Sequence, residues 1–155
     1  MISPFGFLLA VAVAFTADQV TKVVALQNLN VWASVAILPG LNLTLGFNDG
    51  ISFGILADTV FGQPLILVTL TGLLTCYLCF LGGTATRPLE GAGYGSIVGG
   101  SLGNIVDRLR QGAVTDFLDI YWSDWHWPTF NVADIAIVVG VAAIALSAFS
   151  TPAKT

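Results

Sequence analysis

The chain has 155 residues, of which 55% are hydrophobic and only 9% are charged, and its mean hydropathy is +0.86. One water-facing domain of this length cannot bury so much apolar surface, which excludes a soluble globular protein and indicates a membrane protein. The formal charge of -4 and the lack of a Lys/Arg cluster exclude nucleic-acid binding, which requires basic groups that displace phosphate counterions.

Four apolar segments approach the length of a membrane-spanning helix, which is about 20 residues for a hydrocarbon core of roughly 30 Å. They lie at about 5–25, 64–81, 92–109 and 132–149. The third is the least apolar, and the first could instead be a cleaved signal peptide, although no positive region precedes it. We expect an all-α membrane fold in which residues 1–155 form one domain, a bundle of four transmembrane helices.

Two basic residues predict the orientation of this bundle. Arg87 lies in the short loop after the second segment, and Lys154 follows the fourth. Because cytoplasmic loops are enriched in Lys and Arg, we expect both termini in the cytoplasm and the segments 28–61 and 110–131 outside.

The outer segments contain two further patterns. Segment 41–56 alternates apolar and polar residues on both sides of Asn48-Asp49-Gly50, which predicts a small extracytoplasmic β-hairpin. Segment 121–128 is crowded with aromatic residues, as is typical of chain that lies among lipid headgroups. We expect an interfacial aromatic segment there.

Glycine recurs at every fourth position of the third segment, at Gly91, Gly95, Gly99 and Gly103. A repeated GxxxG lets helix backbones approach closely in a membrane, so this stripe predicts tight helix packing. Asp107 continues the stripe.

Several polar residues lie in or beside the apolar segments, where each needs a partner or a task. Asp18 and Lys22 are four residues apart and can pair on one helix face, which is equally compatible with a purely structural ion pair. Asn104 and Arg108 share a face, with Asp107 beside them. Arg108 could stabilise nearby carboxylates, bind lipid phosphate, or simply extend to the membrane surface.

Asp116 and Asp134 are the candidate catalytic residues. Each has an ordinary alternative, because Asp116 could be a solvated loop acid and Asp134 the third residue of a helix capped by Asn131. Two carboxylates held close in a low-dielectric site tend instead to share one proton and can act as acid and base together. One would activate a water that attacks a peptide carbonyl, while the other would hydrogen-bond the carbonyl oxygen. No metal or cofactor is expected, and HExxH is absent from the sequence.

Cys76 and Cys79 form a CxxC within an apolar run. No further Cys or His lies nearby to complete a tetrahedral metal site, so we interpret both as lipid-facing or packing residues.

Five ordered motifs resemble those of bacterial lipoprotein signal peptidases, the signal peptidase II family of membrane aspartic peptidases. They are Asp18–Lys22 (DQxxK), Phe47–Gly54 (FNxGxxFG), Gly99–Arg108 (GGxxGNxxDR), Gly112–Phe117 (GxVxDF) and Phe130–Asp134 (FNxAD). Thr115 departs from the commoner apolar residue before the first aspartate.

The resemblance implies an inner-membrane endopeptidase that removes the signal peptide of prolipoproteins immediately before the diacylglyceryl-modified Cys, near the outer face. It implies Asp116 and Asp134 as the catalytic pair, with Asp18, Lys22 and Asp107 in support. The residues implied to line or brace the substrate site are Asn48, Gly50, Asn104, Arg108 and Asn131. We expect the protein to act as a monomer among membrane lipids.

Two other function classes fit part of the sequence. A non-enzymatic proton or ion relay would use Asp18, Lys22 and Asp107, but it gives no reason for Asp116, Asp134 and the aromatic residues to gather on one side. A different intramembrane hydrolase would use His126 as its base, although a histidine in a Trp-rich loop is more often a headgroup anchor.

Overall fold

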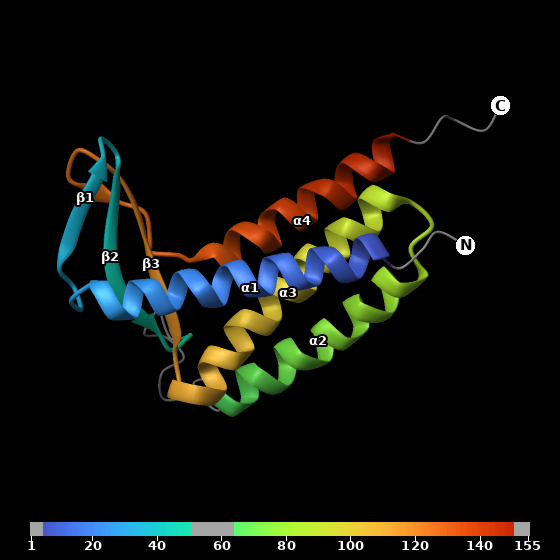
Figure 1. Cartoon of the computed structure of the whole chain (residues 1–155), viewed down its shortest axis with the longest axis horizontal. Helices are drawn as coiled ribbons and strands as arrows, with labels where there is room; N and C mark the ends of the chain where they lie inside the picture. Colours follow the sequence, from blue (N-terminus) through green and yellow to red (C-terminus); the bar gives the residue numbers. More distant parts are fainter. Residues whose placement is uncertain (1–4, 51–63, 151–155) are drawn as a thin grey trace.

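The computed structural model describes residues 5–50 and 64–150, in which four helices predominate (Figure 1). These are α1 (Phe5–Asn28), α2 (Pro64–Thr84), α3 (Pro88–Gln111) and α4 (Val132–Phe149). The four predicted helical segments are confirmed, but α3 begins earlier than the predicted residue 92. Pro88 occupies its first turn, where the missing N–H would have had no helical partner, and Gly112 ends it with a φ of 81°.

α3 is the central helix and contacts each of the other three. Its predicted glycine stripe faces α1, because a Cβ on Gly99 would press against the carbonyl oxygen of Val11. A second glycine face meets α4, where a Cβ on Gly100 would press against the carbonyl oxygen of Ala133. Small residues on two faces therefore let α3 sit between two neighbouring backbones.

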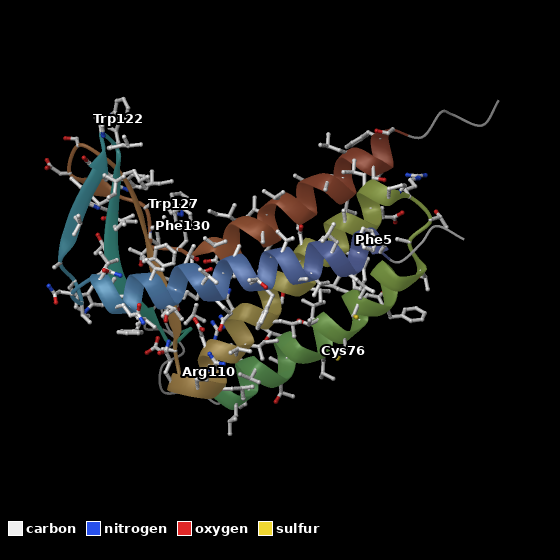
Figure 2. All side chains as sticks on the ribbon, viewed as in Figure 1. Phe5, Cys76, Arg110, Trp122, Trp127 and Phe130 are labelled. Atoms are coloured by element: carbon white, nitrogen blue, oxygen red, sulfur yellow. The ribbon has the colours of Figure 1, made fainter. Side chains whose placement is uncertain are left out.

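Three of the described helices are long and apolar enough to cross a membrane, namely α1, α2 and α4. Cys76 and Cys79 on α2 are exposed free thiols, as the lipid-facing interpretation predicted, and Figure 2 shows Cys76 on the side of α2 away from the bundle. Arg87 donates a hydrogen bond to the carbonyl oxygen of Ser147 at 2.6 Å, so it also satisfies the end of α4. Lys154 lies outside the described residues.

A four-stranded antiparallel sheet lies at one end of the bundle, opposite the start of α1 and the end of α4 (Figure 1). Its strands, in spatial order, are β1 (Ser34–Leu38), β2 (Leu41–Asn48), β3 (Val114–Trp122) and β4 (Trp125–His126). Figure 2 shows Trp122 and Trp127 in this part of the molecule and Phe5 at the far end of the helices.

The predicted hairpin at 41–56 is only partly observed. Its first half forms β2, which makes a hairpin with β1 through Pro39 and Gly40, the latter at a φ of 88°. Proline followed by a glycine of positive φ is typical of a type II turn. The other half, residues 51–56, lies outside the described residues.

β3 is a strand that the sequence pattern did not predict. It carries Asp116 at 2% exposure, so the interpretation of Asp116 as a solvated loop acid is wrong. The sheet is fixed to the helices by a small apolar cluster in which Ala25 of α1, Leu45 of β2 and Phe117 of β3 are all buried. This packing places β3 beside the start of α4.

Candidate active site

Asn131 lies at the centre of the candidate site and is fully buried. It caps α4, because its side chain accepts a hydrogen bond from the backbone nitrogen of Asp134 at 3.0 Å, while the Asp134 carboxylate accepts one from the backbone nitrogen of Asn131 at 3.1 Å. The sequence predicted Asn131 as the cap and Asp134 as the third residue of the helix, and the reciprocal bond completes a capping box. It holds the Asp134 side chain at the beginning of the helix.

The same asparagine binds the other candidate aspartate. Its Nδ2 lies 2.6 Å from Oδ1 of Asp116 and 3.2 Å from Oδ1 of Asn104. Asn104 in turn donates to Oδ1 of Asp134 at 3.1 Å. Asn131 and Asn104 therefore join β3, α3 and α4, and they bring the carboxylates of Asp116 and Asp134 into one hydrogen-bonded cluster.

The environment of Asp116 favours its protonated form. Burial, followed by the negative charge of Asp134, raises the pKa of Asp116 to about 6, although hydrogen bonds from Asn131 and Asn48 act in the opposite direction. A carboxyl group with such a pKa exchanges its proton readily near neutral pH, as acid–base catalysis requires.

Lys22 of α1 makes three polar contacts of equal length next to the candidate site. Its Nζ lies 2.9 Å from Oδ2 of Asp18, from Oδ2 of Asp107 and from Oδ1 of Asn104. The predicted Asp18–Lys22 pair is thus present and buried, and Asp107 is a second partner. Asp18 also accepts the backbone N–H of Ala133, and Asp107 accepts that of Thr115, each at 3.0 Å. Each supporting carboxylate therefore holds the residue that precedes one of the two candidate aspartates.

Arg108, Asn48 and Gly50 lie at the side of this cluster. The positive charge of Arg108 interacts with the carboxylates of Asp116 and Asp134. Its Nε is buried and, among the described residues, has no hydrogen-bond partner. Asn48 hydrogen-bonds Asp116 and accepts the backbone N–H of Gly50 at 2.9 Å. Gly50 has a φ of 87°, and a Cβ there would collide with Leu67 and approach Arg108, so this position favours glycine.

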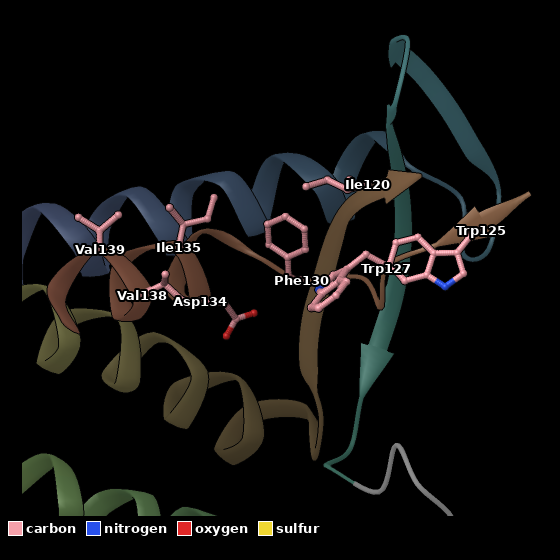
Figure 3. A pocket seen from close by; sticks show the side chains of 8 residues that line it. All are labelled: Ile120, Trp125, Trp127, Phe130, Asp134, Ile135, Val138 and Val139. Atoms are coloured by element: carbon pink, nitrogen blue, oxygen red, sulfur yellow. The ribbon is translucent and has the colours of Figure 1, made fainter. Parts of the chain in front are cut away.

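Two cavities open onto the two aspartates. One, of about 480 Å³, is lined by Asp134 together with apolar side chains of β3, β4 and α4, and Figure 3 shows the Asp134 carboxylate between the start of α4 and the aromatic residues. The other, of about 380 Å³, is lined by Asp116, Asn48 and Trp32, among others. The cluster therefore has open space on two sides in which a chain could bind.

The protein-family model described as "Signal peptidase (SPase) II" matches residues 10–150. The chain belongs to the signal peptidase II family. This confirms the resemblance that the five motifs indicated.

Similar proteins agree with this membership of the signal peptidase II family. The lipoprotein signal peptidase of Actinobacillus succinogenes is 41% identical over 98% of this chain and 94% of its own length. That of Geobacter metallireducens is 39% identical over 90% and 88%. A solved structure described as a bacterial membrane enzyme has a TM-score of 0.81 at 25% identity and covers 94% of both chains.

Two residues that contact the cluster were not predicted as site residues. Gln19 donates from Nε2 to Asp18 at 3.2 Å and to Asp107 at 3.3 Å. Thr115 contributes its carbonyl oxygen, 3.3 Å from Nδ2 of Asn131. Both lie inside the recognised motifs, so their place in DQxxK and GxVxDF was the available signal.

Proposed function

We propose that this chain is an aspartic endopeptidase that cleaves prolipoproteins immediately before their diacylglyceryl-modified Cys, with Asp116 and Asp134 as its catalytic residues. The observation that carries this proposal is the link between two carboxylates from different elements through Asn131, which caps one and lies 2.6 Å from the other. Two acidic groups beside open cavities and a shared set of amide donors fit acid–base hydrolysis by a bound water.

The reaction needs only one proton between the two carboxyl groups at its start. The ionised carboxylate takes a proton from water as the water oxygen bonds to the scissile carbonyl carbon, while the protonated carboxyl hydrogen-bonds the carbonyl oxygen. The tetrahedral intermediate then collapses, the C–N bond breaks, and the leaving amine of the Cys takes up a proton from the pair. The products are a signal peptide with a free carboxylate and a lipoprotein with a free amino group. The pair titrates as a unit, so base and acid are roles of the pair.

The surrounding residues have supporting roles in this proposal. Asn48 and Asn131 orient Asp116, and Asn104 orients Asp134. Arg108 brings a positive charge close to both carboxylates, which limits their mutual repulsion. Gly50 leaves room between Leu67 and Arg108 at the edge of the site.

Asp18, Lys22 and Asp107 form the frame beneath the site. Their ion pairs and backbone contacts give these buried charges a structural use. This accounts for the residues on which a proton or ion relay would have depended.

For the membrane, we infer that α3 is the fourth crossing and that residues 1–155 form one domain. Its lower apolarity is compatible with this role because its three neighbours shield it from lipid. β2 follows α1, β3 follows α3, and the two strands pair, which requires both connections to lie at the same end of the bundle. With both termini in the cytoplasm of a bacterial inner membrane, the sheet and the active site lie at the outer face.

The substrate would reach this site while anchored in the same membrane. Its lipid-modified Cys would hold the scissile bond at a fixed depth, so part of the orientational entropy is lost before the reaction begins. A monomer is sufficient, because all residues proposed for catalysis come from one chain.

Cleavage of a synthetic prolipoprotein peptide by the purified protein in lipid tests the proposal. We expect a cut before the diacylglyceryl-modified Cys, none of the unlipidated peptide, and loss of cleavage in Asp116→Asn and Asp134→Asn. Asp124→Asn, an exposed acid in the turn between β3 and β4, is the matched control and should retain activity. Full activity in either dyad variant would exclude the assignment, and an inactive but folded wild-type protein would exclude the function.

A further inference from the structure

A chain of polar side chains crosses all four strands of the sheet outside the proposed catalytic cluster. Oγ1 of Thr44 on β2 donates to Oδ2 of Asp119 on β3 at 2.9 Å, and Nδ1 of His126 on β4 lies 2.8 Å from the other oxygen, Oδ1. The hydroxyl of Ser34 on β1 lies 2.8 Å from Oγ1 of Thr44. Because a hydroxyl has one hydrogen and Thr44 gives it to Asp119, Ser34 is the donor in this last bond.

Asp119 is the buried centre of this chain, with 3% of its surface exposed. Burial acts to raise the pKa of Asp119, but the hydrogen bonds from His126 and Thr44 outweigh it and hold the pKa below its usual range. The residue is therefore an ionised acceptor at neutral pH, and hydrogen bonds to an ionised acceptor are stronger than those between neutral groups.

β4 depends on this contact because it is very short. It has two residues, Trp125 and His126, which pair with Trp122 and Tyr121. One backbone bond follows, from the nitrogen of Trp127 to the oxygen of Ile120 at 2.8 Å. The ring of His126 also stacks on Tyr121, with centroids 5.5 Å apart and an angle of 22° between the planes.

The residues on either side of His126 line the cavity beside Asp134, which is called the substrate groove below. Successive side chains of a strand point to opposite faces, so a contact made by His126 directs Trp125 and Trp127 the other way. Both tryptophans line the groove of about 480 Å³ that contains Asp134, and their rings meet edge to face with centroids 5.8 Å apart (Figure 3).

We propose that Asp119 and His126 are positioning residues, which hold β4 so that Trp125 and Trp127 form the outer wall of the substrate groove. The inference rests on the proposed function for the identity of the substrate. Neither residue touches the reacting atoms. Their loss would weaken substrate binding, while the cluster around Asp116 and Asp134 would keep its chemistry.

The test compares KM and kcat of His126→Leu and Asp119→Asn with the wild-type protein on the lipidated prolipoprotein peptide. Because the lost contact positions the groove wall and not the reacting groups, we expect KM to rise about tenfold and kcat to stay within about twofold. His126→Asn, whose Nδ2 takes the place of the histidine Nδ1 and can still donate to Asp119, should recover most of the lost affinity. The double variant should be no worse than the more severe single variant, because both changes act on the same contact. Asp124→Asn is again the control and should match wild type.

Amide hydrogen exchange over residues 121–128 tests the contact without any reliance on activity. Exchange in this segment should be at least about tenfold faster in His126→Leu than in Asp124→Asn. An unchanged KM would overturn the inference, whether or not kcat falls. Unchanged amide exchange in residues 121–128 would also overturn it. If the wild-type protein does not cleave the peptide but His126→Leu still exchanges faster than Asp124→Asn, the proposed function is contradicted and the contact is established.

Discussion

Asp18 accepts a hydrogen bond at 3.0 Å from the backbone nitrogen of Ala133, 115 residues later in the chain. Asp107 makes the matching contact with the backbone nitrogen of Thr115. Lys22 lies between these two carboxylates and pairs with both. The positions of Asp116 and Asp134 thus depend on one buried ammonium group.

Replacement of Lys22 should therefore be costly. Lys22→Met leaves Asp18 and Asp107 buried without their counter-charge, and we expect a loss of about 3–5 kcal/mol in the free energy of unfolding. Denaturation of the purified protein in detergent measures it. Arg110→Met is the control, because this residue is exposed and its hydrogen bond to Gln19 is long, at 3.4 Å. Equal stability of the two variants would show that the frame is not held by Lys22.

The close approach of α3 to α1 can be tested with one methyl group. A Cβ on Gly103 would collide with the carboxylate of Asp18, whereas a Cβ on Gly72 of α2 would meet nothing within 4 Å among the residues that the structure describes. Gly103→Ala should lower both stability and cleavage, because it displaces Asp18 from Lys22 and Ala133. Gly72→Ala should be neutral or more stable by up to about 1 kcal/mol, the difference in helix propensity. Thermal unfolding and peptide cleavage distinguish the two, and a harmless Gly103→Ala would contradict this packing.

Asp116→Asn should separate activity from stability. The native pKa of Asp116, about 6, lies above its ordinary value of 3.8, so the native state binds the proton more tightly than the unfolded state does. The stability that this proton contributes is present below about pH 4 and is lost as pH rises through 6, by about 3 kcal/mol in total. Asn carries no such proton.

The stability of Asp116→Asn relative to wild type should accordingly rise between pH 4 and pH 7, although we expect the variant to be inactive. Unfolding measured at several pH values in detergent shows the difference. Asp124→Asn, an exposed position, should follow the wild-type curve. Parallel curves for Asp116→Asn and wild type would mean that Asp116 titrates normally.

The double role of Asn131 leads to a further prediction. Asn131→Ala removes both the cap of α4 and the donor to Asp116, and it should cost about 1 kcal/mol for the cap and about 100-fold in cleavage through misplacement of the carboxylates. Asn131→Ser keeps a capping oxygen but is too short to bridge to Asp116. It should regain stability without regaining activity. Recovery of both properties in Asn131→Ser would indicate that only the cap matters.

Much of the helical frame could be predicted from the sequence, because its signals are local. Apolar runs of spanning length marked the helices, the spacing of Asp18 and Lys22 marked an ion pair, and the position of Asn131 before Asp134 marked a cap. Each of these depends on residues within one or two turns of each other.

Other parts depend on contacts that no local pattern reveals. β3 was missed because its first four residues are all buried, so it lacks the alternation expected of a half-exposed strand. Spacing also could not show that Asn104 bridges Lys22, Asn131 and Asp134, since these partners come from two other helices and a cap. Nor could the position of His126 in a Trp-rich loop show that its partner is Asp119.

The placement of the two aspartates on β3 and α4 determines when, during synthesis and membrane insertion, the pair is complete. Asp134 and the Asn131 that bridges it to Asp116 belong to the last helix and its cap. During synthesis, a chain that has already inserted α1, α2 and α3 still lacks half of the proposed pair. Proteolytic competence would thus arrive only when the final segment is inserted and docked, so a truncated or misinserted chain would be unable to cut its neighbours in the membrane.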